Sequence, residues 1–356
     1  MRTVLPPTGP LRSGRLIAAV TVGVIGLALA LSGCTATSGS SGSTTLVLYN
    51  AQHEQTTAAL VAAFTKQTGI QVKIDNDDED VLTAKIEQEG TRSPADVFFT
   101  ENSNWLQQLA DRGMLSKVDS TTLANVPAQD SAKDDDWVAV SARVSALVYN
   151  TRDLTAAEMP TSVLQLADPR WKGKIEIAPA ETDFWPIVSS VDHTYGDAKT
   201  LAWLKGLKAN AGANGVVPDN ETLTADVNSG SAKIALINHY YFDRLRAETG
   251  ASSIHSALSY FAAGDAGYLK TYSGAAILKS STHQAAAQKL VAFLTSKAGQ
   301  ETLAKSDSFE YPLAAGVAAN SADTPLRDLH PSTTFTPAEF GTGEDAKRLL
   351  QEAQLL

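Results

Sequence analysis

Cysteine is almost absent from this chain of 356 residues, which contains a single one, Cys34. One cysteine excludes an internal disulfide and a zinc site built from several thiolates. Several enzyme motifs are missing as well. No Gly-x-Ser-x-Gly elbow, phosphate-binding P-loop or Gly-x-Gly-x-x-Gly loop follows a predicted strand. The sequence therefore gives no support to a serine hydrolase or to an enzyme that binds nucleotides through these loops.

Positive charge is also scarce. The chain has 29 Lys and Arg against 39 Asp and Glu, a net charge of −10. Removing residues 1–33, which hold three arginines and no acidic residue, takes the net charge to −13 and leaves 323 residues. This balance argues against nucleic acid and against an anionic membrane surface as partners. It is compatible with a cationic ligand.

The N-terminus has the pattern of a secretory signal. Arg2, Arg12 and Arg15 precede the uncharged residues 16–31, and Leu31-Ser32-Gly33-Cys34 follows. A basic start, a short apolar run and small residues before a cleavage point are typical of exported proteins. The run is short for a helix that spans a membrane. A membrane anchor and an ordinary signal peptide are the alternatives.

The end of that segment resembles the lipobox of bacterial lipoproteins, in which the cysteine is lipidated and becomes the first residue. We therefore predict a signal peptide over residues 1–33 and a lipid anchor on Cys34. Residues 34–45 are rich in Ser, Gly and Thr and are expected to form a flexible tether. The remaining length is typical of two hydrophobic cores.

Residues 46–99, which follow the tether, alternate between strand and helix patterns. Strands are expected at residues 46–49, 70–74 and 95–99, with helices through Leu60 and Phe64, closed by Gly69, and through Leu82 and Ile86, ending at Gly90. This β-α-β-α-β order predicts an α/β fold with a mixed, mostly parallel sheet flanked by helices. Ligands of such sheets bind beyond the carboxyl ends of the strands, where His53 and Glu101 stand.

Two long strand-like runs, residues 137–150 and 268–278, bracket the middle of the chain. They suggest two hinge strands that cross between two lobes. Lobe one is expected to hold residues 46–142 plus 272–318, and lobe two residues 143–271 plus 319–356. Further elements are expected at residues 175–177, 201–204, 234–237, 285–294 and 299–304, with a C-terminal amphipathic helix carrying Leu349, Leu350 and Leu355 on one side.

Two adjacent tyrosines, Tyr240 and Tyr241, follow the apolar run 234–237. Neighbouring residues of a strand point to opposite faces, so two adjacent tyrosines share one ligand only where the strand breaks. Asn238 and His239 supply such a break. A phenolate oxygen is a hard, anionic donor that suits a trivalent cation such as ferric iron. The alternative is ordinary packing of two half-buried rings.

Five stretches resemble a known family, the ferric-ion-binding proteins of bacterial ABC importers, which have the transferrin-like periplasmic-binding-protein fold. They are residues 49–53 (YNAQH), 94–101 (PADVFFTE), 171–175 (WKGKI), 235–241 (ALINHYY) and 272–276 (YSGAA). The likeness runs in order from about residue 46 to about residue 313. It implies a type II fold of two lobes and a binding protein rather than an enzyme.

The resemblance also implies a ligand set and partners. One His and one Glu from lobe one and two Tyr from lobe two would hold Fe3+, and the matching residues are His53, Glu101, Tyr240 and Tyr241. An ABC permease and its ATPase would receive the iron. The protein would be a monomer held at the outer face of the cytoplasmic membrane, or in the periplasm, without nucleic acid.

A bound anion, often phosphate, is a further feature implied by the resemblance. The positions of amide side chains match at Asn102, Asn220 and Asn238, and Arg143 matches a position near the cleft. An ion pair between the lobes is the alternative for Arg143.

The turn that would hold the anion departs from the family pattern, because it has Glu181, Thr182 and Asp183 in place of small residues. Carboxylates there would repel phosphate, so a protein carboxylate is a candidate for its place. The alternative is that both acidic side chains point to solvent and cap a helix that begins near Phe184.

Other polar clusters are weaker candidates. Residues 75–80 resemble a calcium loop but lack the Gly and Glu that an EF-hand needs, so we expect a solvated acidic loop. The remaining histidines, among them His239, show no metal-ligand spacing and are expected at the surface or at helix caps. Two alternatives to ferric capture stay open: binding of another small solute or oxyanion on the same fold, and a metal-dependent or hydrolytic enzyme.

Overall fold

The computed structural model describes residues 44–320 and 324–356. The predicted signal peptide, the lipidation site Cys34 and all but the last two residues of the predicted tether lie outside the described residues. In the part of the chain that is described, no helix combines the length and the apolar character needed to span a membrane.

The strands form one continuous mixed sheet in the order β2-β1-β3-β9-β5-β7-β6, with β4 paired to β9 and β8 and β10 paired to β5. Their bounds are β1 Thr45–Ala51, β2 Gln71–Asn76, β3 Val97–Thr100, β4 Leu115–Ser116, β5 Trp137–Asn150, β6 Ile175–Glu176, β7 Ile234–Asn238, β8 Ser256–Ser259, β9 Lys270–Leu278 and β10 Tyr311–Pro312. Each strand expected from the sequence is present, shifted by at most a few residues.

Parallel pairing is limited to the segments where strands and helices alternate. β1 pairs in parallel with β2 and β3, and β6 with β7. Apart from an isolated parallel bridge between Ile177 and Val216, the other pairings described all involve β5 or β9 and are antiparallel. The expectation of a mostly parallel sheet is therefore too strong, because the two long strands run against their neighbours.

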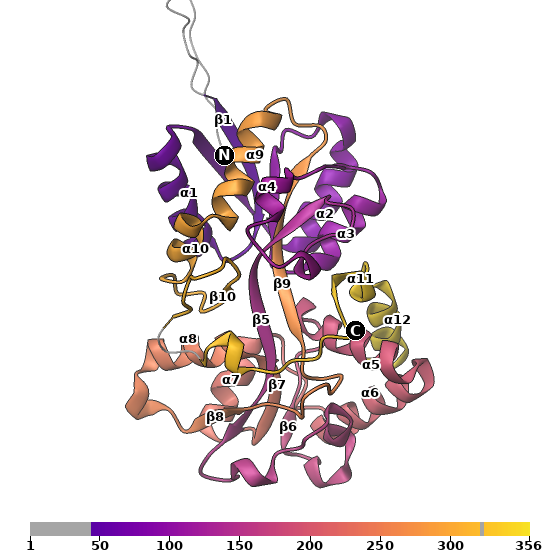
Figure 1. The fold of residues 1–356 in the computed structure, drawn as a ribbon. Helices are drawn as coiled ribbons and strands as arrows, with labels where there is room; N and C mark the ends of the chain where they lie inside the picture. The colour runs from indigo at the N-terminus through magenta and orange to yellow at the C-terminus, as the bar shows by residue number, and fades with distance from the viewer. Residues whose placement is uncertain (1–43, 321–323) are drawn as a thin grey trace, which may run out of the picture. The chain divides into compact units, whose positions relative to one another are not determined.

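β5 is buried at every position and changes partners along its length. It pairs with β9 from Trp137 to Val144 and with β7 from Ser145 to Tyr149. We call the sheet of β1 to β4, β9, β10 and the first part of β5, with its helices, lobe one. The sheet of β6 to β8 and the second part of β5, with its helices, is lobe two. Figure 1 shows β5 and β9 connecting them.

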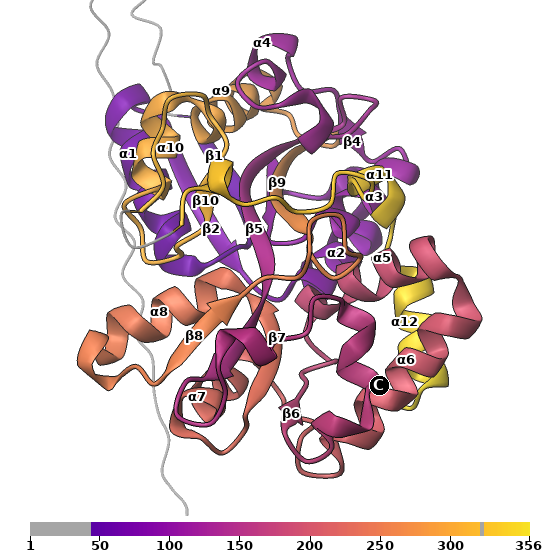
Figure 2. The ribbon, with the colours of Figure 1, turned by 60° about the horizontal axis from the view of Figure 1, so that its bottom comes forward.

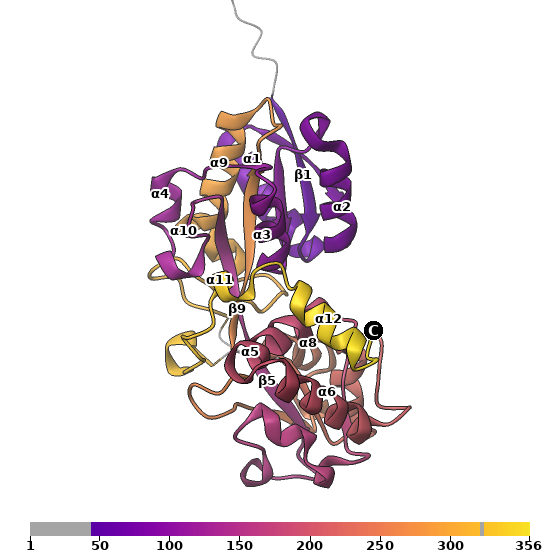
Figure 3. The same ribbon diagram turned by 90° about the vertical axis from the view of Figure 1, so that its right-hand side faces the viewer.

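Helices cover both faces of each sheet. Their bounds are α1 Glu54–Thr68, α2 Glu79–Glu89, α3 Ser103–Asp111, α4 Ser120–Leu123, α5 Trp185–Tyr195, α6 Asp197–Ala211, α7 Asn220–Ser229, α8 His239–Thr249, α9 Gln284–Thr295, α10 Lys297–Leu303, α11 Pro337–Phe340 and α12 Glu344–Glu352. In lobe one, α1, α9 and α10 pack on one face and α2 and α3 on the other (Figure 3).

Two helix ends illustrate how the sequence sets these elements. Gly69 ends α1 in the left-handed conformation with φ of 75°, and its N–H bonds to the carbonyl of Thr65. Glycine adopts this conformation without steric cost. At the C-terminus, α12 packs against α5 and α6, and Leu349 and Leu350 are fully buried (Figure 2). The predicted amphipathic C-terminal helix is thus confirmed for Leu349 and Leu350, whereas Leu355 lies beyond its end.

Candidate metal-binding site

Two predicted ligands stand at the carboxyl ends of adjacent parallel strands. Ala51 of β1 pairs with Thr100 of β3, so the residues that follow both strands emerge at the same edge of the sheet. His53 immediately precedes α1, and Glu101 immediately follows β3. Their side chains meet, with Nδ1 of His53 2.6 Å from Oε1 of Glu101.

This contact changes the proton affinity of both groups. Burial lowers the pKa of His53, but the Glu101 carboxylate outweighs burial and raises the pKa to about 9. Burial raises the pKa of Glu101, but the positive charge of His53 outweighs it and lowers the pKa to about 2. At neutral pH the pair is therefore an imidazolium and a carboxylate.

The two tyrosines lie in the first turn of α8, immediately after β7. β7 is buried throughout and ends at Asn238, and α8 begins at His239. The rings of Tyr240 and Tyr241 are buried, with centroids 4.2 Å apart. The break from strand to helix sends both hydroxyls toward one point: each donates a hydrogen bond of 3.0 Å to Oδ2 of Asp183. Burial, and then the Asp183 charge, raise the pKa of both hydroxyls well above the usual value.

Side chains from both lobes contact one another at this point. The His53 ring lies edge-on to the Tyr240 ring, with centroids 5.4 Å apart. Nη1 of Arg244, on α8, lies 3.4 Å from Nε2 of His53. The structure thus brings His53, Glu101, Tyr240 and Tyr241 into one cluster, although they come from three separate segments of the chain.

Asp183 belongs to a short 3-10 helix, Thr182–Phe184, that runs into α5. Its side chain is buried and faces the tyrosine hydroxyls, so the interpretation of Asp183 as a solvent-facing helix cap is wrong. Glu181, the residue before this helix, makes no side-chain capping bond and lines a cavity. Burial, and then the Asp183 charge, raise the pKa of Glu181 to about 8.

Arg143 is fully buried on β5 and contacts three carboxylates. Its nitrogens lie 2.9 Å from Glu310, 3.3 Å from Asp183 and 3.5 Å from Glu101. A fourth contact, of 2.8 Å, goes to Oδ1 of Asn102. The contact of Arg143 with Asp183 is an ion pair between segments of the two lobes, while its role beside a bound anion stays a prediction.

Asn102 and Glu79 connect lobe one to the Asp183 turn. Nδ2 of Asn102 lies 3.1 Å from Oγ1 of Thr182 and 3.3 Å from Oδ1 of Asp183. Glu79 accepts hydrogen bonds from Thr182 at 2.8 Å and from Trp105 at 3.0 Å. Burial and the Glu101 charge raise the pKa of Glu79 to about 7.

Sequence reasoning missed Glu79 and Glu310. Glu79 lies within the acidic run 75–80, which was expected to be solvated, yet it is buried. The run itself is otherwise mostly exposed, and Asp75 forms an ion pair with Lys85. Each residue is identified only by its contact with a residue far along the chain. Glu79 accepts a hydrogen bond from Thr182, and Glu310 forms an ion pair with Arg143. Neither contact can be read from a sequence pattern.

Three other residues singled out in the sequence are not where the sequence analysis placed them. Asn220 and Asn238 are buried at the starts of α7 and α8 but are not among the residues that line the cavity beside the cluster. His239 was expected at the surface or at a cap. It is buried instead, stacked on Tyr311 with centroids 4.3 Å apart, and burial lowers its pKa to about 3.

A cavity of about 1040 Å³ opens beside the cluster and is lined from both lobes. Its ionisable lining residues are mostly acidic: Glu54, Asp77, Asp78, Glu79, Asp80, Glu101, Glu181 and Glu221, with His53, Arg244 and Lys347 as the basic members. Such a lining attracts cations and repels anions.

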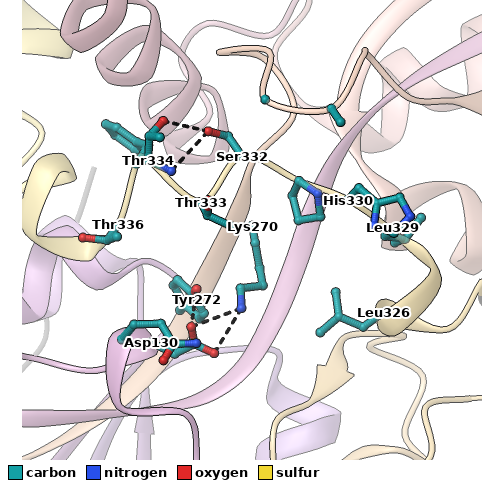
Figure 4. Close-up of a pocket in the computed structure, with 15 residues that line it drawn as sticks. Asp130, Lys270, Tyr272, Leu326, Leu329, His330, Ser332, Thr333, Thr334 and Thr336 are labelled. Atoms are coloured by element: carbon teal, nitrogen blue, oxygen red, sulfur yellow. Dashed lines mark hydrogen bonds and ion pairs between the residues drawn. The ribbon is translucent and has the colours of Figure 1, made fainter.

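A second cavity, of about 510 Å³, lies where β9, the loop before β5 and the C-terminal segment meet (Figure 4). Its charged groups are already paired. The Asp130 carboxylate accepts a bond of 2.6 Å from Tyr272 and lies 3.1 Å from Lys270. None of the predicted site residues lines it, so it is separate from the tyrosine cluster.

The donor set of the cluster favours a hard cation. Among the described residues, no three His, Cys, Asp or Glu side chains are placed to hold a metal, so a metal at this point requires the tyrosine oxygens. Two phenol oxygens, carboxylates and one imidazole are a set that suits a hard, highly charged ion.

Known proteins are similar to this chain over most of its length. The model of the family described as bacterial extracellular solute-binding protein matches residues 92–331. The Fe(3+)-binding periplasmic protein of Serratia marcescens is 39% identical over 284 residues, which cover 80% of this chain and 83% of that protein. The major ferric iron-binding protein of Neisseria meningitidis serogroup B is 36% identical over 310 residues, covering 86% and 92%.

Solved structures agree with the sequence matches. The iron-bound HitA of Pseudomonas aeruginosa superposes with a TM-score of 0.82 at 39% identity, covering 87% of this chain and 99% of that one. These matches confirm the resemblance to ferric-ion-binding proteins and the type II periplasmic-binding-protein fold. The chain belongs to the family of bacterial extracellular solute-binding proteins.

Proposed function

We propose that this protein captures ferric iron between its two lobes and delivers it to a membrane permease. The observation that carries the proposal is the convergence of two buried tyrosine hydroxyls from lobe two with the His53–Glu101 pair from lobe one. In this proposal His53, Glu101, Tyr240 and Tyr241 are ligands of the iron. Relatives named as ferric-iron-binding proteins support the choice of metal.

Charge supports the choice of a trivalent ion. Two phenolates and the Glu101 carboxylate supply three negative charges, which neutralise Fe3+ when His53 is neutral. Phenolate and carboxylate oxygens are hard donors, which prefer hard cations over soft ones. An ordinary packing role for two adjacent tyrosines gives no reason for both hydroxyls to meet at one carboxylate oxygen.

The origin of the ligands supports a capture mechanism. Two ligands belong to each lobe, so the iron binds fully only when the lobes are together. A ligand with contacts to both lobes selects the closed arrangement, because the open arrangement lacks half of those contacts. The metal thus holds the two lobes together until a partner separates them.

Delivery to an ABC permease with its ATPase is part of the proposal, as is a location outside the cytoplasmic membrane. The family description and the periplasmic relatives support both. The protein is proposed to act as a monomer and as a binding protein rather than an enzyme. Four protein ligands leave little open coordination for a reacting substrate.

The direct test is the colour of the protein mixed with Fe3+. Phenolate bound to ferric iron gives a visible charge-transfer band, which binding of another solute or an oxyanion does not. We expect one band that saturates at one iron per protein. The double variant Tyr240→Phe with Tyr241→Phe serves as the colourless control. No band at saturating iron in the wild-type protein would contradict ferric capture by these tyrosines.

The lipid anchor on Cys34 is a separate proposal, supported by the lipobox-like residues 31–34 and the lone cysteine. Cys34→Ser is expected to move the protein from the membrane fraction to the soluble fraction or the medium. Iron binding by that variant should match the wild type. A variant that stays in the membrane fraction after removal of the signal peptide would rule out the anchor.

A further inference from the structure

We propose that Glu310 is a positioning residue of the iron site, which holds the lobe-one ligands His53 and Glu101 in place without touching the metal. This inference rests on the proposed function, because those two residues are ligands only in that proposal. The observation that leads to it is a buried network of hydrogen bonds that joins the Glu310 carboxylate to the backbone of both ligands.

Glu310 is placed by the pairing of β10 with β5. Tyr311 pairs with Ala142 in antiparallel register. Continuing that register by one residue sets Glu310 opposite Arg143, and Oε1 of Glu310 lies 2.9 Å from Nη1 of Arg143. Neither of these two side chains is exposed to solvent. Buried charges are stable only when they are paired and hydrogen-bonded, so this ion pair fixes the position of both groups.

One arm of the network reaches His53 through Gln52. Oε2 of Glu310 accepts a hydrogen bond of 3.0 Å from Nε2 of Gln52 and one of 2.6 Å from the Ser141 hydroxyl. Oε1 of Gln52 in turn accepts a bond of 2.7 Å from the backbone N–H of His53. The Gln52 amide is buried and bonded at both ends, which fixes its orientation. Since His53 immediately precedes α1, the bond from Gln52 sets where the imidazole enters the site.

The second arm reaches Glu101 through Arg143. Nη2 of Arg143 donates to the backbone carbonyl of Glu101 and, at 2.8 Å, to Oδ1 of Asn102. Nη1, the nitrogen that Glu310 holds, lies 3.5 Å from Oε2 of Glu101. A guanidinium group is planar and rigid, so an ion pair at one nitrogen orients the other. Glu310 therefore acts on the backbone and on the carboxylate of Glu101 through one group.

The residue before Glu310 supplies an independent observation. Phe309 has a φ of 57°, a left-handed conformation that is uncommon for residues other than glycine. Its carbonyl oxygen lies 3.0 Å from Nε2 of His239, the residue before Tyr240. Backbone strain of this kind persists only where the surrounding structure imposes it. The turn at Phe309 and Glu310 thus contacts the segments that carry the ligands of both lobes.

The alternative role for Glu310 is to neutralise the buried Arg143 and so stabilise lobe one, without an effect on the ligands. The two roles differ in which amides exchange faster with solvent when the carboxylate is lost. A positioning residue loosens the His53 amide alone. A residue that only stabilises the lobe lowers the melting temperature and speeds exchange in the central strands as well, at Leu48 of β1 for example.

The test compares the full mature wild-type protein with two variants, without and with Fe3+. Glu310→Gln keeps the size of the side chain and removes its charge. Gln52→Leu breaks only the arm to His53 and leaves the ion pair of Glu310 intact, so it decides the outcome if Glu310→Gln does not fold. Asp130→Asn is the matched control, because Asp130 is a buried carboxylate whose bonded partners lie on β9 in the second cavity.

In the iron-free protein, hydrogen exchange at the His53 amide should be about tenfold faster in both variants, with no matching change at Leu48. With Fe3+, the affinity should fall about tenfold in Glu310→Gln and about threefold in Gln52→Leu. The visible band should persist in both variants, because the tyrosines are unchanged. In the His53→Ala background, Gln52→Leu should have no further effect on affinity, because no imidazole is left to position.

Wild-type exchange at the His53 amide in both variants would overturn the proposal. So would a loss of affinity in Asp130→Asn as large as that in Glu310→Gln, or an effect of Gln52→Leu that is equal in the wild-type and His53→Ala backgrounds. A wild-type protein that fails to bind Fe3+ would instead contradict the proposed function, and the exchange rates of the iron-free protein would still decide whether Glu310 positions His53.

Discussion

The two lobes supply the proposed site with groups of different charge. Lobe one offers His53 and Glu101 as a charged pair, with the pKa of the first raised to about 9 and that of the second lowered to about 2. Lobe two offers Tyr240 and Tyr241 as neutral phenols, whose pKa values burial raises well above the usual value. Only Glu101 is ready to coordinate a metal at neutral pH.

This difference shows where the selectivity of the site arises. Each phenol must give up a proton from a buried position, and only a cation of high charge offsets that cost. The carboxylate of lobe one would accept many cations. In the proposed site, the tyrosines of lobe two would restrict binding to ions such as Fe3+, and the Glu101 carboxylate of lobe one would be the less selective ligand.

Removal of the tyrosine hydroxyls should have the largest effect. Tyr240→Phe or Tyr241→Phe leaves part of the charge of a poorly solvated ion uncompensated, a loss of about 3–5 kcal/mol in binding free energy. This corresponds to roughly 100-fold to several thousand-fold weaker binding. His53→Ala should lose less, because water replaces a neutral donor. The measurement is iron titration followed by the visible band.

We expect the tyrosines of lobe two to contribute more to iron affinity than His53 of lobe one. Tyrosine variants that both bound Fe3+ as tightly as the wild type would contradict this expectation. A His53→Ala variant that lost more affinity than either of them would contradict it too. Tyr311→Phe is a suitable control, since Tyr311 is a buried tyrosine of lobe one whose hydroxyl donates to the carbonyl of Thr324 rather than to the cluster.

The second largest effect should be the release of protons on iron binding. Tyrosines with their ordinary pKa start protonated near pH 7, so the two of them should release about two protons per iron. With the pKa of His53 raised to about 9, its imidazolium adds a third. Affinity should therefore rise with pH, with a slope of about three protons up to pH 9 and about two above it. A pH-stat titration measures the number directly.

His53→Gln isolates the contribution of lobe one to the number of protons released per iron. The variant has no imidazolium, so it should release about two protons at pH 7 and lose the change of slope near pH 9. The same proton count for His53→Gln and the wild type would mean that His53 is neutral before iron binds. A count of zero for the wild type would mean that the tyrosines are not ligands.

Iron should also make the protein more compact in solution. Because the ligands come from both lobes, iron favours the arrangement in which the lobes meet. Small-angle scattering with and without Fe3+ should show a smaller radius with iron. The double variant Tyr240→Phe with Tyr241→Phe should show no change. An equal radius in both states of the wild type would indicate a rigid binder.

The fold was largely predictable because its elements have local signals. The alternation of strand and helix before residue 100, the glycine that ends α1 and the long apolar runs of β5 and β9 are visible in the sequence. The strand-to-helix break that puts Tyr240 and Tyr241 together is local too. Parallel and antiparallel pairing is not local, which is why the share of parallel strands was overestimated.

The surroundings of the tyrosines were not predictable to the same degree. Burial of Glu79 depends on donors that come from Thr182 and Trp105, far along the chain. Burial of Glu310 depends on Arg143 in the same way. A charged residue in an acidic run looks solvated until the fold supplies its partners. Distant pairing of this kind is what a single sequence does not contain.

The smallest effect should come from a single hydroxyl that bonds across the two lobes. The Thr182 hydroxyl donates to Glu79 at 2.8 Å and accepts from Asn102 at 3.1 Å, and Thr182→Val removes both bonds. Trp105 continues to donate to Glu79, and Asn102 keeps its bond to Asp183. A loss of about 1 kcal/mol should speed the removal of iron by a chelator roughly fivefold. Thr83→Val is the matched control, because the buried Thr83 hydroxyl on α2 has no hydrogen-bond partner among the described residues. Equal release rates for Thr182→Val and the wild type would mean that this hydroxyl does not help hold the lobes together.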